Sequence, residues 1–206
     1  MTKIGHYVVI EGPLRVGKTT LATALADRAH GRLLLDETAN PHLAGFYMGR
    51  PGAAFRAQMH FLMRRYTLCS EAHIETSKLP VVSDYLFERD KLFAYLNLDD
   101  DEVEIYDSYY EHLRPQIPTP GMVVYIRATP QLLRERLASG PEARVSDAYL
   151  EATVRAYDHF FDRYPATDLR VVEVSEADLL NNPADLHSLV DELAELPIGG
   201  QALLPL

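Results

Sequence analysis

The sequence has 206 residues, enough for one domain with a sizeable hydrophobic core. Apolar residues make up 47% and charged residues 24%, as in ordinary globular proteins, and no apolar run is long enough to span a bilayer. The formal net charge of -10 argues against sequence-independent nucleic-acid binding, since such proteins gather Lys and Arg to neutralise phosphates. Cys69 is the sole cysteine, which excludes an intramolecular disulfide, and we expect a cytoplasmic protein.

Apolar, β-branched runs alternate with helical patterns along the chain. Strands are predicted at 6–10, 32–36, 80–84, 121–127 and 170–174. Helices are predicted at 18–29, 52–77, 85–96, 100–114, 130–139, 147–163 and 183–195, the fourth of them opened by the acidic run 99–102. Strands separated by helices favour right-handed crossovers and a parallel sheet. We therefore expect an α/β, three-layer fold with a five-stranded parallel sheet flanked by helices.

The whole chain, 1–206, is expected to form a single domain. The runs 33–35, 80–82 and 122–126 are continuously apolar, which is typical of strands buried on both faces. No internal repeat or low-complexity segment is present. The tail 197–206 is expected to be loosely ordered.

The first predicted strand leads into a segment that matches G-x-x-x-x-G-K-[ST] in its required strand–loop–helix setting. Gly12 and Gly17 let successive backbone N–H groups point at a polyphosphate. Lys18 reaches the outer phosphates and Thr19 is a ligand for Mg²⁺. The predicted cofactor is ATP, or another nucleoside triphosphate, with Mg²⁺. The residues predicted to bind it here are Gly12, Arg15, Val16, Gly17, Lys18, Thr19 and Thr20. The side chain of Arg15 lies either beside the phosphates or in solvent.

Further motifs follow the next two predicted strands. The second strand ends in Asp36-Glu37, with Tyr47 downstream, and the long helix after it contains Gln58 and Arg65. The third strand ends in Ser83-Asp84-Tyr85, and Arg89-Asp90 follows. Together with the phosphate loop, this series resembles the deoxynucleoside kinase family over most of the chain, in particular its bacterial deoxyadenosine/deoxyguanosine kinase branch.

The resemblance implies a P-loop kinase-like fold and transfer of the γ-phosphate of ATP to the 5′-hydroxyl of a deoxyribonucleoside. Deoxyadenosine and deoxyguanosine are the favoured acceptors, and the choice between them stays open. By the same resemblance Glu37 is the general base, a role that needs a well-placed and only modestly basic carboxylate. Lys18 and Asp84 also belong to the predicted catalytic set, and Thr19 and Asp84 are the predicted metal ligands.

The resemblance also assigns the acceptor site and a partner. Tyr47 matches the tyrosine that contacts the sugar 3′-hydroxyl, and Gln58 and Arg65 match residues that read the base. Asp90 joins them, because a carboxylate accepts hydrogen bonds from the N–H groups of a purine. Asp84 is placed near the phosphates. Family members pair through two helices, so a homodimer is implied, or a heterodimer with a related subunit.

The chain departs from the family most clearly in its arginines. Arg136 matches the first arginine of a lid predicted at about 136–146, and is expected to be catalytic and to cover the donor nucleotide. Two further lid arginines are missing, and Arg144 is a candidate substitute. Tyr85 replaces the arginine that the wider family has after Asp84, a change that is typical of the bacterial branch. Arginines on a transferring phosphoryl group are worth about 10³–10⁵ in rate. Two alternatives stay open. One is a nucleoside monophosphate (thymidylate-like) kinase, since that related family shares the loop and lid, and the other is a nucleotide-binding subunit with weakened catalysis, suggested by the missing lid arginines.

Overall fold

The computed structural model describes residues 6–138, 145–164, 167–174, 182–195 and 201–205, and the side chains of 201–205 are not described. The chain divides into two compact units. The first contains Met1–Leu35, Thr76–Tyr85 and Thr119–Leu206. The second contains Asp36–Glu75 and Leu86–Pro118.

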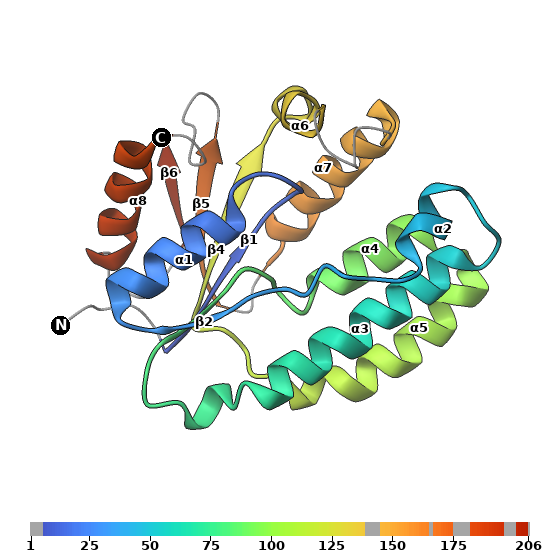
Figure 1. The fold of residues 1–206 in the computed structure, drawn as a ribbon, viewed down its shortest axis with the longest axis horizontal. Helices are drawn as coiled ribbons and strands as arrows, with labels where there is room; N and C mark the ends of the chain where they lie inside the picture. The colour runs from blue at the N-terminus through green and yellow to red at the C-terminus, as the bar shows by residue number, and fades with distance from the viewer. Residues whose placement is uncertain (1–5, 139–144, 165–166, 175–181, 196–200, 206) are drawn as a thin grey trace. The chain divides into compact units, whose positions relative to one another are not determined.

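The first unit contains a parallel sheet with the strand order β2-β3-β1-β4-β5-β6 (Figure 1). The five predicted strands are confirmed with small changes at their ends, and a sixth is added. Their bounds are Tyr7–Glu11 (β1), Arg32–Leu34 (β2), Val81–Ser83 (β3), Met122–Ala128 (β4), Asp168–Val174 (β5) and Gln201–Pro205 (β6).

The sheet differs from the predicted one at both edges. Gln201–Pro205, within the tail 197–206, pairs in parallel with β5 and covers an otherwise open strand edge. The run 33–35 is not buried on both faces, because β2 is an edge strand. Leu33 and Leu35 are each 39% exposed.

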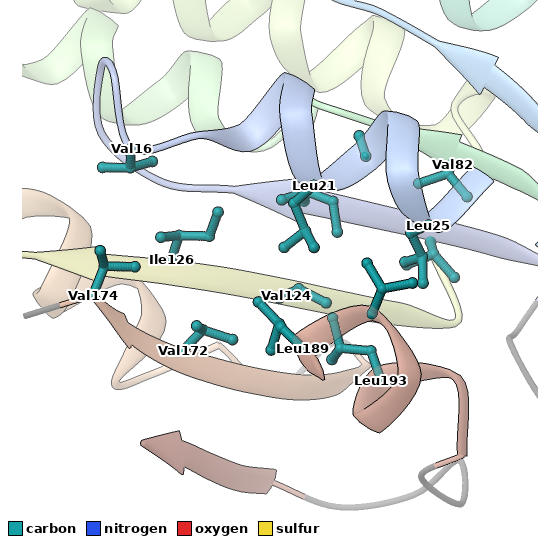
Figure 2. Close-up of a cluster of buried hydrophobic side chains, with 14 of the residues drawn as sticks. Val16, Leu21, Leu25, Val82, Val124, Ile126, Val172, Val174, Leu189 and Leu193 are labelled. Atoms are coloured by element: carbon teal, nitrogen blue, oxygen red, sulfur yellow. The ribbon is translucent and has the colours of Figure 1, made fainter. Parts of the chain in front are cut away.

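Four long helices accompany this sheet in the described part of the first unit: α1 (Lys18–Ala29), α6 (Pro130–Leu137), α7 (Asp147–Phe161) and α8 (Pro183–Glu195). The predicted ranges 18–29 and 183–195 agree with α1 and α8. Leu21 and Leu25 of α1 pack with Leu189 of α8 in one buried cluster that includes alternate residues of β4 and β5 (Figure 2). The intervening residue Tyr125 points to the other face, where it stacks on Phe161 of α7 at 4.2 Å between ring centroids.

The second unit is helical: α2 (Leu43–Tyr47), α3 (Ala53–Glu71), α4 (Arg89–Asn97) and α5 (Asp100–Leu113). The helix predicted over 52–77 ends at Glu71, and His73 just beyond it adopts a φ of 48°. The acidic start predicted for α5 is confirmed, because the carboxylate of Asp99 accepts a hydrogen bond from the backbone N–H of Glu102 at 2.9 Å. The short helix α2 was not predicted.

Aromatic rings hold α5 in the second unit. Phe87, which precedes α4, stacks on Tyr110 of α5 with centroids 5.6 Å apart. Within α5, Tyr106 stacks on Tyr110 at 6.3 Å. Tyr106 and Leu62 are fully buried, so α3 and α5 each supply core residues.

Across the described residues, none of the helices is apolar over a stretch long enough to traverse a membrane.

Candidate functional site

The loop between β1 and α1 has the backbone that phosphate binding requires. Gly12 has a φ of +155°, and a Cβ atom at this position would lie 2.5 Å from the carbonyl oxygen of Ile126. Gly17 has a φ of 99° and is the N-cap of α1. Glycine therefore lets the loop approach β4 and turn into the helix, whose N-terminal N–H groups attract anions. The buried side chain of Val16 fixes the loop to the core (Figure 2).

Lys18 lies folded over this loop. Its ammonium group donates hydrogen bonds to the carbonyl oxygens of Gly12 at 2.9 Å and Pro13 at 2.8 Å. These contacts hold a positive charge at the mouth of the loop. A bound polyphosphate offers the same ammonium stronger, charged acceptors.

Thr19 and Asp84 meet next to the loop, as the prediction of a shared metal site requires. The hydroxyl of Thr19 donates to Oδ2 of Asp84 at 2.6 Å, and Asp84 is buried. Asp84 follows β3, the neighbour of β1, so the two residues come from adjacent strand ends. One hydroxyl and one carboxylate suit Mg²⁺, which takes few protein ligands and completes its octahedron with water and phosphate oxygens.

Glu11, the last residue of β1, supports this loop and was missed by sequence reasoning. It is fully buried, and its Oε1 accepts hydrogen bonds from the backbone N–H of Gly12 at 2.8 Å and from the hydroxyl of Tyr157 at 3.1 Å. The carboxylate thus links the end of β1 to α7 and fixes the first residue of the loop. The signal for it was a carboxylate at the last position of an otherwise apolar strand.

The structure brings the first lid arginine to the phosphate loop. Nη1 of Arg136 donates to the carbonyl oxygen of Arg15 at 3.2 Å, and Arg15 has a φ of 61°. Thr20, the last predicted loop residue, lies in the first turn of α1. Arg144 and most of the predicted lid fall in 139–144, outside the described residues.

The second unit contains a buried cluster of two arginines and two aspartates. Arg65 donates to both carboxylate oxygens of Asp36, at 2.9 Å from Nε and 2.7 Å from Nη2. Arg89 donates to Oδ2 of Asp36 at 2.9 Å, and Nη1 of Arg65 also pairs with Asp90. All four side chains are at most 10% exposed. Because the four charges balance, burial of the cluster is tolerated.

The two aspartates of this cluster have opposite pKa shifts. Burial alone would raise the pKa of Asp36, but the charges and hydrogen bonds of Arg65 and Arg89 outweigh it and hold the pKa well below its ordinary value. Burial raises the pKa of Asp90 to about 6, against the opposing attraction of the same two arginines. Within the described residues, Oδ2 of Asp90 has no hydrogen-bond partner. That oxygen is a buried acceptor that the described residues leave unpaired.

Gln58 and Arg65 both lie on α3 and both are buried. No other described side chain or backbone group binds the amide of Gln58, so it is available to a ligand. The guanidinium of Arg65 lies over the ring of Phe61, 4.6 Å from its centroid.

Tyr47, predicted to contact the sugar, lies at the end of α2, and its side chain is 48% exposed.

Glu37, the predicted base, forms an ion pair with Arg64 of α3. Sequence reasoning did not anticipate this partner, nor the joining of Asp36 to Arg65 and Arg89. Such pairs depend on how α3 and α4 pack against the segment after β2. The order of the elements along the sequence does not specify that packing. The only advance signal was a carboxylate pair, Asp36-Glu37, in a unit with a neighbouring arginine pair, Arg64-Arg65.

Known proteins resemble this chain in sequence and in fold. A family model described as deoxynucleoside kinase matches residues 8–197. A deoxyguanosine kinase of Bacillus subtilis (strain 168) is 29% identical, with 92% of this chain and 97% of that protein covered. A deoxyadenosine/deoxycytidine kinase of the same organism is 24% identical, with 92% of each covered. A deoxyadenosine kinase from M. mycoides, solved with bound dATP, has a TM-score of 0.75 at 18% identity, covering 91% of this chain and 98% of that chain.

Proposed function

The chain belongs to the deoxynucleoside kinase family, and from this premise we propose that it transfers the γ-phosphate of Mg²⁺-bound ATP to the 5′-hydroxyl of a purine deoxyribonucleoside. The observation that carries the proposal is the 2.6 Å contact between Thr19 and Asp84. This contact supports the proposal because it pairs a hydroxyl that can bind a metal with a carboxylate beside the phosphate loop. Phosphoryl transfer requires a metal ion at such a place.

The donor is held by groups of the first unit. The loop N–H groups and Lys18 bind the phosphates, Thr19 and Asp84 hold Mg²⁺, and Arg136 covers the nucleotide. When bound, the metal neutralises charge on the transferring phosphoryl group. The protein contributes mainly position and positive charge, because little covalent chemistry remains for it to do.

The acceptor is held by groups of the second unit. Glu37 accepts the proton of the 5′-hydroxyl, and Tyr47 contacts the sugar. Asp90 and Gln58 read the base, while Arg65 holds Asp90 in position. A guanine presents two adjacent donors, N1–H and the 2-amino group, to the one oxygen of Asp90, Oδ2, that Arg65 leaves unpaired. The 29% identical deoxyguanosine kinase of Bacillus subtilis supports deoxyguanosine as the first acceptor to test.

The test is a panel in which ATP and Mg²⁺ are offered with each deoxynucleoside and each deoxynucleoside monophosphate, and products are separated by chromatography. The proposal predicts turnover of purine deoxynucleosides and none of monophosphates. Turnover of monophosphates alone would establish the nucleotide kinase alternative. Binding of ATP without any turnover would establish a nucleotide-binding subunit.

A further inference from the structure

The ion pair between Glu37 and Arg64 is at the surface of the second unit rather than in its core. The side chain of Glu37 is 41% exposed and that of Arg64 is 43% exposed, whereas the next residue, Arg65, is 7% exposed. The pair is therefore open to a ligand. Arg65 is fully engaged by Asp36 and Asp90 and has no hydrogen-bond donor directed to Glu37.

The pair engages only one oxygen of the predicted base. Nη2 of Arg64 donates to Oε2 of Glu37. Within the part of the chain that the structure describes, Oε1 of Glu37 has no hydrogen-bond partner. One oxygen is thus fixed by a cation and the other is left to accept a proton.

Arg64 presents its guanidinium to the carboxylate of Glu37 from α3, within the second unit. Arginine suits this task, because its planar fork fixes a carboxylate more strictly than an ammonium group does.

We propose that Arg64 is a positioning residue: it holds Oε2 of Glu37 so that Oε1 faces the 5′-hydroxyl of the acceptor. This inference rests on the proposed function. In the step concerned, the O5′–H bond breaks and the proton moves to Oε1, while O5′ bonds to the γ-phosphorus. The bond from that phosphorus to the bridging oxygen breaks, and its electron pair leaves with ADP. Arg64 stays protonated throughout.

The test is a double-mutant cycle on kcat with Arg64→Ala, Glu37→Gln and the double variant, using radiolabelled ATP and deoxyguanosine. Arg64→Ala should lower kcat by about 10–100-fold, the range for a misplaced reacting group, with the KM for ATP within about twofold of wild type. In the Glu37→Gln background the same substitution should cost less than about twofold, because a residue acting only through that carboxylate has nothing left to position.

Arg56→Gln is the matched control, since Arg56 is an exposed arginine of the same helix that donates to the carbonyl oxygen of Pro51. Its kcat should stay at the wild-type value. The unfolding midpoint of Arg64→Ala should stay near that of wild type, because an exposed ion pair contributes little stability.

Two results would overturn the inference in a wild-type enzyme that is active: an unchanged kcat in Arg64→Ala, or losses that multiply in the double variant. The second result would mean that Arg64 acts on the phosphates directly. A wild-type protein that phosphorylates no deoxynucleoside would instead contradict the proposed function.

Discussion

At the scale of single residues, the proposed chemistry depends on a few side chains whose surroundings differ sharply. Glu37 is half-exposed and shares its charge with one arginine, whereas Asp90 is buried in a cluster with two arginines and another aspartate. The first environment suits proton transfer with a solvent-accessible ligand. The second suits rigid recognition of a base edge, because every rotamer in the cluster is held by a partner.

Recognition by Asp90 should depend on pH. The pKa of Asp90 is raised to about 6 by burial, with Arg65, Arg89 and Asp36 as the charged groups around it. Above pH 6 the carboxylate is ionised and accepts the N–H donors of guanine, and as the pH falls through 6 it takes up a proton and loses an acceptor. The KM for deoxyguanosine should therefore rise about fourfold between pH 7.5 and 5.5.

Steady-state kinetics over that pH range measures this effect. Asp90→Asn should have a raised KM that stays constant across the same range, because an amide does not titrate there. A wild-type KM that is equally constant would contradict base recognition by this carboxylate.

Gly12 should be intolerant of any side chain. Gly12→Ala places a Cβ 2.5 Å from the backbone oxygen of Ile126, at a φ of +155°. The loop must shift, at a cost of about 1–3 kcal/mol in stability, and ATP binding should be lost. Thermal unfolding and ATP titration measure the two effects. Gly121→Ala is the control, because its nearest neighbour is an ordinary 3.7 Å away, and an equal loss in both variants would contradict the account.

At the scale of elements, hydrophobic pattern and motif context predicted most of the fold. The phosphate loop, α1 and α8 were predicted with their observed bounds, because Gly12, Gly17 and the apolar spacing act locally. The exposed β2 and the added β6 could not be predicted in this way, because the place of a strand in the sheet depends on pairing with distant residues. The partners of Asp36 and Glu37 were missed for the same reason.

The N-cap of α5 offers a test of local stability in the second unit. Asp99→Ala removes the acceptor for the backbone N–H of Glu102 and should lower the free energy of unfolding by about 1 kcal/mol. Asp100→Ala, one residue inside the helix, should cost only a few tenths, about 0.3 kcal/mol, through the helix dipole. Chemical denaturation of the two variants gives the comparison, and equal losses would contradict the capping role.

At the scale of the whole molecule, the family resemblance implies a dimer, and α5 presents apolar side chains that suit one. Ile105 and Tyr109 lie one turn apart on the same side of α5 and are 50% and 52% exposed. We expect sedimentation velocity to give a dimer, and Ile105→Asp to shift it towards monomer by burying an unpaired charge at the interface. A wild-type monomer at all concentrations would contradict this expectation.

Group transfer itself is the central claim, and the position of the label in the product tests it most directly. With γ-labelled ATP, Mg²⁺ and deoxyguanosine, the account predicts a labelled deoxynucleoside monophosphate whose phosphate is released by a 5′-nucleotidase. It also predicts that Glu37→Gln forms this product about 10²–10⁴-fold more slowly while binding ATP normally. Label that remains in ATP, or that enters a 3′-monophosphate, would contradict the account.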